Sequence, residues 1–239
     1  MEKFIRSLST FITLILIYVI GSYIYLSSKG FEYKNGVFTL VKQAKAEISA
    51  TTEFANPIDK NVALNFKADK FIGDENAPLT LFEFSSLGCG HCADFHLNML
   101  PKLKQDFISQ GKLKVVFVNF PLEKKSMKAA LLVECLDNED REKLLDTLFL
   151  KQREWMLSFK FEDLLRKYAN DLNLSQEQIN KCLSDENMVQ EITANTQEAI
   201  DKLKMQGTPA FLFSSKDKNE IVYGLSGYEK MKSYINSRL

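Results

Sequence analysis

The sequence predicts an α/β domain that is interrupted by a block of helices. Residues 79–119 show a strand, helix, strand pattern, residues 123–204 show helical patterning without a convincing strand, and two more strands follow near the C-terminus. With 45% hydrophobic residues among 239, the chain can bury a substantial core. Its 31 basic and 31 acidic residues cancel, so the overall charge gives no indication of a nucleic-acid partner.

The first 30 residues contain a long uncharged segment, from Ser7 to Ser28. As a helix rising about 1.5 Å per residue it would reach ~33 Å, enough to cross a bilayer core of about 30 Å. Residues 1–30 therefore predict a signal or an anchor. The A-x-A sequence at 44–46 lies far downstream for signal cleavage, which favours an uncleaved anchor through residues 7–28. A cleaved signal is the alternative, and either predicts a periplasmic location for the rest of the chain.

The remaining chain divides into a tether and a folded domain. Residues 31–70 show no sustained helical period and contain scattered turn residues, so we expect a tether there, followed by the first short element of the folded part. The domain, residues 71–239, starts with a strand at 79–85 within "APLTLFEFSS", which Pro78 opens.

Apolar residues at helical spacing predict a helix from Cys92 onward, with a kink at Pro101 and an end at Gly111. "KLKVVFVNFPL" then predicts a strand at 112–119, whose apolar run is typical of a sheet covered on both faces. The chain closes with the predicted strands "PAFLFS" and "EIVYGLS" and a helix at 228–238.

The helical block occupies about residues 123–204. Its patterning predicts helices at 125–136, 139–156, 161–171, 175–184 and 187–205. Asn138, Ser175 and Asp185 are the predicted N-caps, because their side chains can accept hydrogen bonds from the free N–H groups of a first helical turn.

Two cysteines, Cys89 and Cys92, lie three positions apart where the first predicted strand gives way to a helix. A thiolate at Cys89 would meet the unpaired N–H groups and the positive dipole end of that helix. Such motifs lower thiol pKa values to roughly 3.5–7.5, and His91 adds positive charge when protonated. Cys92, one turn on, is within disulfide reach but more shielded, which suits it to resolve a mixed disulfide.

Two other interpretations of these cysteines are open. A zinc site would use Cys89, Cys92 and His96, but the sequence lacks a second cysteine doublet and a third histidine, so we expect no metal. A purely structural disulfide between Cys89 and Cys92 would close too small a loop to stabilise the fold much.

In this context the chain resembles the thioredoxin superfamily and, within it, the DsbA-like thiol-disulfide oxidoreductases of bacterial envelopes. The resemblance spans about residues 70–238. It depends on the order and spacing of "GDENAPLTLFEFSS", "CGHC", "FVNFPL", the helical insertion and "GTPAFLF". It implies a thioredoxin fold with an inserted helical subdomain. The segment "FVNFPL" departs from the pattern, since it has Val118 where related chains often have a basic residue.

The resemblance assigns roles to single residues. It implies that Cys89 is the exposed nucleophile, that Cys92 is the buried resolving cysteine, and that His91 tunes the pKa of the nucleophile. Pro209 falls where the superfamily has a cis-proline facing the disulfide, which would leave neighbouring backbone groups free to pair with an extended substrate. Thr208, just before it, would set specificity.

Three further residues receive implied roles. Glu83 matches the buried acid of the family, because burial raises a carboxyl pKa and would let it exchange protons with Cys92. Cys135 and Cys182 are the implied second disulfide, in the helical insertion. The alternative for Cys135 and Cys182 is a pair of free buried thiols that behave as small hydrophobic residues.

We therefore expect an envelope enzyme that donates the Cys89–Cys92 disulfide to reduced exported proteins, with no cofactor. A membrane redox partner would reoxidise the pair. An anchored thiol reductase or an isomerase is the first alternative, and a noncatalytic zinc- or peptide-binding module is the second.

Overall fold

The computed structural model describes residues 18–23, 25, 31–34, 37–40, 54–59, 62, 65–66 and 69–239. The chain divides into two units, residues 1–53 and residues 54–239. In the first unit, residues 18–23 and 25 are helical, and β1 (Phe31–Lys34) pairs antiparallel with β2 (Val37–Leu40).

The predicted anchor, residues 7–28, lies largely outside the described residues. Within the ranges that are described, no helix combines the length and the apolar character needed to cross a membrane. The anchor therefore stays a prediction.

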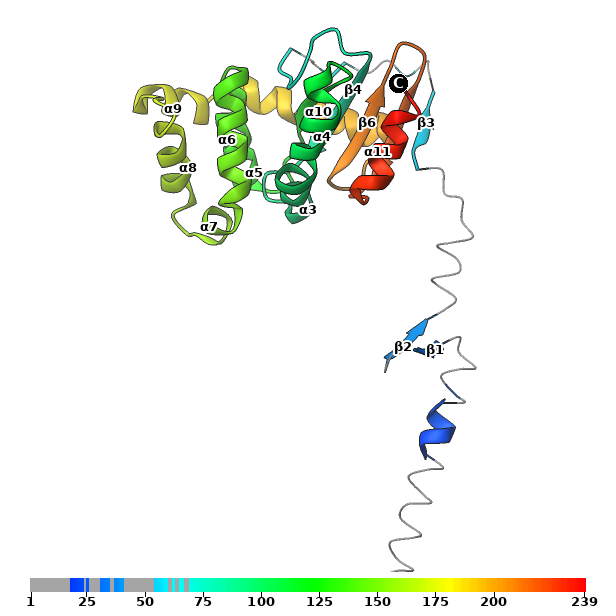
Figure 1. The fold of residues 1–239 in the computed structure, drawn as a ribbon. Helices are drawn as coiled ribbons and strands as arrows, with labels where there is room; N and C mark the ends of the chain where they lie inside the picture. Colours follow the sequence, from blue (N-terminus) through cyan, green and yellow to red (C-terminus); the bar gives the residue numbers. More distant parts are fainter. Residues whose placement is uncertain are drawn as a thin grey trace, which may run out of the picture. The chain divides into compact units, whose positions relative to one another are not determined.

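The second unit is built on a five-stranded sheet in the order β3-β7-β6-β4-β5 (Figure 1). The strands are β3 (Asn56–Ile58), β4 (Leu79–Ser85), β5 (Leu113–Asn119), β6 (Ala210–Ser214) and β7 (Asn219–Tyr223). β4 runs parallel to β5 and antiparallel to β6, and the β6–β7 and β7–β3 pairs are antiparallel. Strands from either side of the helical block thus meet in the centre of one sheet.

The folded unit begins earlier than the predicted boundary at residue 71. Strand β3 lies within residues 31–70, where we expected a tether and then a first short element of the folded part, and it pairs with β7 so that Asn56 faces Ile221. Ala55 is buried in the core beside it. Three residues are too few to leave a periodic signal, and the partner lies 165 positions away, so only the tertiary structure places this edge strand.

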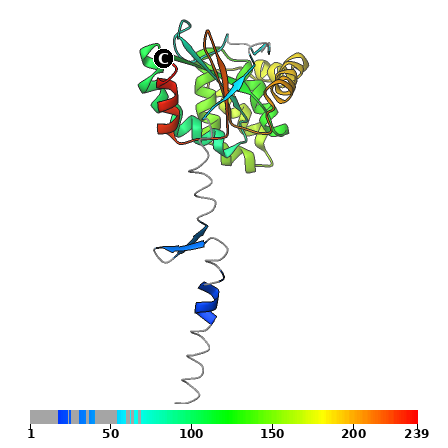
Figure 2. The same cartoon turned by 90° about the vertical axis from the view of Figure 1, so that its right-hand side faces the viewer.

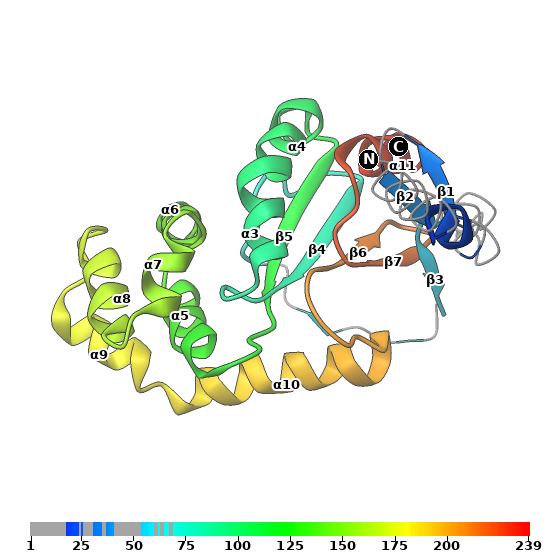
Figure 3. The same cartoon turned by 90° about the horizontal axis from the view of Figure 1, so that it is seen from below.

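Helices cover both faces of the sheet (Figures 2 and 3). One face carries α3 (Gly90–Asp94), α4 (Leu100–Asp106) and α11 (Tyr228–Asn236), and the other carries α10 (Glu186–Leu203). Leu103 and Ile235 pack into the same cluster as Leu81 of β4. On the opposite face, Leu203 of α10 joins the cluster of Val118. This layering confirms the prediction of an apolar β5 buried on both faces.

The helical block confirms most of the predicted helices. It contains α5 (Lys124–Glu134), α6 (Asn138–Leu150), α7 (Gln152–Leu157), α8 (Phe161–Asn170) and α9 (Gln176–Leu183). Ser175 caps α9 in a reciprocal capping box and Asp185 caps α10, both as predicted. The predicted cap at Asn138 is wrong by one residue, because Asp137 accepts the hydrogen bond from the N–H of Asp140.

The single helix predicted at 139–156 is wrong, because the chain breaks at Lys151 into α6 and α7. Trp155 accounts for the break. Its side chain is fully buried, and its Nε1 donates to the carbonyl of Leu148 at 2.8 Å. A straight helix would hold Trp155 two turns away from Leu148, so the backbone must turn before α7 can bury the indole.

The helix predicted from Cys92 is built from three parts. A π-helical turn, Phe95–Met99, joins α3 to α4, and Pro101 is the second residue of α4. Gly111 ends the segment in the left-handed region, with φ of 67°, as its position predicted.

Candidate active site at the start of helix α3

Both cysteines of "CGHC" lie where β4 passes into α3. Cys89 has extended backbone angles and is the N-cap residue of α3, while Cys92 lies one turn inside the helix. Cys89 is half-buried, Cys92 is fully buried, and both are free thiols. The structure therefore reproduces the asymmetry that the spacing predicted.

The surroundings drive the pKa values of the two thiols apart. A hydrogen bond from the Cys92 thiol lowers the pKa of Cys89 to about 5, and the backbone N–H groups of Cys92 and His91 add to the shift, while partial burial opposes it. Burial raises the pKa of Cys92, the hydrogen bond that its thiol donates to Cys89 raises it further, and negative charge on Glu83 adds to the shift. Cys89 is thus the thiolate at neutral pH.

Glu83 lies on β4, six positions before Cys89, and its side chain is buried beneath the site. Its Oε1 has no hydrogen-bond partner. Burial raises the pKa of Glu83 to about 8, an increase that the charge on Cys89 reinforces and that on Arg141 opposes. The carboxyl group of Glu83 is therefore mostly protonated at neutral pH.

The loop between α10 and β6 brings Thr208 and Pro209 against Cys89. The Thr208–Pro209 peptide bond is cis, and Pro209 is buried. The Sγ of Cys89 lies 3.4 Å from the carbonyl oxygen of Thr208, where the thiol can donate to it. Two segments 119 positions apart in the sequence therefore form one face of the site.

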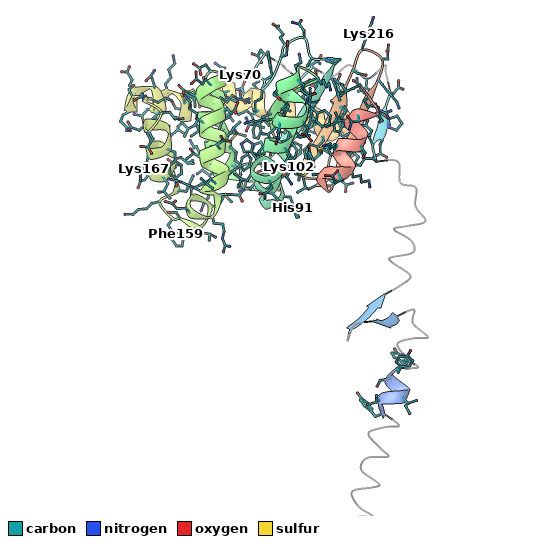
Figure 4. The ribbon with its side chains drawn as sticks, viewed as in Figure 1. Lys70, His91, Lys102, Phe159, Lys167 and Lys216 are labelled. Atoms are coloured by element: carbon teal, nitrogen blue, oxygen red, sulfur yellow. A yellow bond between two sulfur atoms is a disulfide. The ribbon has the colours of Figure 1, made fainter. Side chains whose placement is uncertain are left out.

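The two histidines have separate surroundings. His91 is exposed on α3, and Figure 4 shows it at the lower edge of the fold. His96 is buried, and its Nε2 lies 2.7 Å from Oδ1 of Asp146 on α6. Because His96 faces the helical block, it does not join Cys89 and Cys92 as a third zinc ligand. In the described part of the chain, no group of three or more metal-ligating side chains is assembled.

Sequence reasoning missed the polar side chains that hold the loop before Cys89. Ser86 Oγ lies 3.1 Å from Ser126 Oγ, and Ser126 in turn donates to the carboxylate of Glu123. A Cβ on Gly88 would meet the same Glu123 carboxylate at 2.5 Å, so this glycine is needed for the close packing. Gln152 binds the loop from α7. No local pattern marks these residues, because their partners are distant in sequence.

The other two cysteines are joined. Cys135 follows α5 and Cys182 lies in α9, and they form a disulfide with a Cα–Cα distance of 5.9 Å. The implied pairing is therefore the one found in the structure, and it links two helices of the inserted block.

Comparison with known proteins places this site in a family. The profile described as thioredoxin matches residues 65–237. A Rickettsia bellii protein named as a protein-disulfide oxidoreductase is 30% identical over 65% of this chain, and the chain spans only 61% of the length of that relative. Disulfide bond formation protein D of Bacillus subtilis is 26% identical, over 73% of this chain and 79% of its own length.

Solved structures agree with the sequence relatives. The crystal structure of Wolbachia pipientis α-DsbA1 superposes with a TM-score of 0.66 at 30% identity, covering 73% of this chain and 92% of that chain. Oxidised BdbD of Bacillus subtilis superposes with a TM-score of 0.63 at 24% identity, which supports the fold. The predicted thioredoxin fold with an inserted helical subdomain is confirmed.

Proposed function

Because this chain belongs to the thioredoxin family, we propose that it is a thiol-disulfide oxidoreductase that donates a Cys89–Cys92 disulfide to reduced proteins. The observation that carries the proposal is the opposite displacement of the two thiol pKa values within one turn of α3. A stable Cys89 thiolate is a good leaving group, and stabilising it favours the reduced form of the pair, which makes the disulfide oxidising.

The exchange proceeds in two steps. A substrate thiolate attacks the Sγ of Cys89, a mixed disulfide forms, and the electron pair of the broken S–S bond leaves on Cys92. A second substrate thiolate then attacks the substrate sulfur bound to Cys89 and expels the Cys89 thiolate. The substrate gains a disulfide by losing two electrons, and the enzyme pair takes them up as two reduced sulfurs.

Glu83 serves the first step as a proton donor. Cys92 leaves as a buried thiolate, whose charge the surroundings strongly disfavour. A carboxyl with a pKa of about 8 is protonated at neutral pH and can give its proton to Cys92. The proton transfer neutralises the buried sulfur and commits the mixed disulfide to the second step.

Thr208 and Pro209 form the part of the site that contacts the substrate peptide. The carbonyl of Thr208 lies beside the reactive sulfur, so a peptide that binds along this loop would place its own cysteine next to Cys89. We assign Thr208 as the residue that sets substrate preference and His91 as a modest contributor to the charge around Cys89.

Location and partners follow from the same proposal. Disulfide donation requires an oxidising compartment, and the uncharged segment at residues 7–28 is consistent with export to the periplasm and with attachment to the inner membrane. After each turnover the reduced pair must pass two electrons to an acceptor, for which a membrane redox partner is the proposed class.

Equilibration with glutathione tests the direction of the reaction. We expect a reduction potential well above about −270 mV, the value typical of a thioredoxin-type reductant. Catalysed oxidation of a reduced, unfolded protein should accompany it. A potential near about −270 mV, with reduction of substrates instead, would indicate the reductase alternative.

A further inference from the structure

The side chain of Gln152 bridges the inserted helical block and the active-site loop. Its Nε2 donates to the carbonyl of Leu87 at 2.8 Å and to the carbonyl of Cys89 at 3.0 Å. These two acceptors flank Gly88, so one amide group spans the loop that leads into the nucleophile. Gln152 is the first residue of α7, immediately after the break at Lys151.

Helix α7 provides a fixed base for this side chain. Trp155, buried in the core of the block, ties α7 to the carbonyl of Leu148 in α6. Beside Trp155 in the sequence, the carbonyls of Met156 and Ser158 accept hydrogen bonds from the Nζ of Lys125, at 2.6 Å and 2.9 Å. Side-chain hydrogen bonds to the surroundings thus hold the C-terminal half of the short helix, and this limits the movement of the helix that carries Gln152.

The bonds from Gln152 complete the fixation of the backbone around Cys89. The N–H of Cys89 donates to the carbonyl of Ser86 at 3.0 Å, and its carbonyl accepts from the N–H of Ala93 at 3.1 Å. Gln152 is a second donor to the carbonyl of Cys89. Hydrogen bonds therefore fix the peptide groups on both sides of Cys89. This fixation directs the sulfur toward the free N–H groups of the first turn of α3.

We propose that Gln152 is a positioning residue for the nucleophile, which holds the loop from Leu87 to Cys89 so that the sulfur stays on the N-terminal turn of α3. The inference rests on the proposed function, since it concerns the same sulfur. It also assigns a role in catalysis to the inserted block, because the block supplies the two hydrogen bonds that hold the backbone of the active-site loop.

Two variants remove the donors in different ways. Gln152→Ala shortens the side chain, whereas Gln152→Met keeps its length and apolar packing but cannot donate a hydrogen bond. The matched control is Gln178→Ala, which deletes another glutamine bonded to backbone, at 2.8 Å from the N–H of Ser175 in the capping box of α9. All three variants and the wild type are equilibrated with glutathione, and the pH dependence of Cys89 alkylation is measured alongside.

We expect both Gln152 variants to hold their disulfide about three- to tenfold more tightly than the wild type, since both hydrogen bonds from Gln152 are lost and each contributes modestly. Cys89 alkylation should shift to higher pH, and Gln178→Ala should match the wild type in both measurements. If folded Gln152→Met stays within about twofold of the wild type in both, the bridge is only structural and the inference is wrong. If the wild type itself fails to exchange with glutathione, the proposed function fails first.

Discussion

The two cysteine pairs of this chain have the same atoms and opposite surroundings. Cys89 and Cys92 lie three positions apart at a strand–helix junction, one half-buried and one buried, with pKa values pushed in opposite directions. Cys135 and Cys182 are 47 positions apart and join two helices that already pack on each other. The first pair is therefore suited to thiol-disulfide exchange, and the second pair is suited to stabilising the fold as a cross-link.

The comparison teaches that the reactivity of a cysteine comes from the free N–H groups and buried charges around it. Cys89 meets the open start of a helix, and an acid lies buried beneath the pair. Cys135 instead follows the end of α5, and its N–H donates to the carbonyl of Leu131 within the helix.

The largest effect should come from the nucleophile. Cys89→Ser should abolish oxidation of a reduced model peptide, because a serine hydroxyl cannot form the mixed disulfide. Cys92→Ser, incubated with a disulfide-bonded peptide, should instead accumulate a stable mixed disulfide at Cys89, because the Cys89 thiolate attacks the peptide disulfide, expels the other peptide sulfur as a thiolate, and has no Cys92 to release it. The mixed disulfide is visible as an added mass that dithiothreitol removes. If Cys89→Ser still turned over, or if it accumulated a mixed disulfide on Cys92, Cys89 would not be the nucleophile.

The second pair should contribute to stability and not to exchange. Replacing Cys135 and Cys182 with serine should lower the free energy of unfolding by about 2–4 kcal/mol, since the unfolded chain is no longer closed into a long loop. Urea denaturation measures the loss, and the Cys89–Cys92 glutathione equilibrium serves as the control. A shift in that equilibrium with unchanged stability would break the division of roles.

Glu83→Gln should separate stability from turnover. The pKa of Glu83 is raised to about 8 from an ordinary value near 4.3, so ionisation costs the native state progressively as pH rises from about 4.3 to 8. The variant should therefore be more stable than the wild type at pH 7, by up to about 4 kcal/mol, and equal to it at pH 4. Release of Cys92 should slow by ~10²-fold, measured by stopped-flow mixing. Equal stability at both pH values would show that Glu83 is not a buried acid.

Alkylation of the reduced protein against pH checks the thiolate itself. Iodoacetamide should label Cys89 with a midpoint near pH 5, and leave Cys92 unlabelled in the native state. Because the folded pKa of Cys89 is depressed, its stabilisation of the reduced form is present above about pH 8.5 and is lost as pH falls toward 5. A midpoint near 8.5 would remove the physical basis of the oxidase proposal.

The smallest effect should come from His91→Ala. The side chain of His91 is exposed, and the contribution of this residue to the Cys89 pKa comes through its backbone N–H, which alanine retains. The alkylation midpoint should therefore move upward by less than about one pH unit. A larger shift would mean that the imidazole itself faces the sulfur.

The sequence alone determined the order of the strands and helices around the active site and the identity of the reactive pair. Strand β4, the "CGHC" turn and β5 are local patterns, in which period, cap and spacing lie within a few residues of each other. The positions of Pro209 and Glu83 followed from the resemblance, since neither has a local signal for its role.

The tertiary structure determined the features that depend on contacts between segments distant in the sequence. The edge strand β3, the break at Lys151 and the placement of Gln152 on the active-site loop all need partners from elsewhere in the chain. The pKa of Glu83 is likewise a product of burial, which no neighbour in sequence supplies. Hydrogen bonds and desolvation act through space, so these features become determinate only when distant segments of the chain pack against one another.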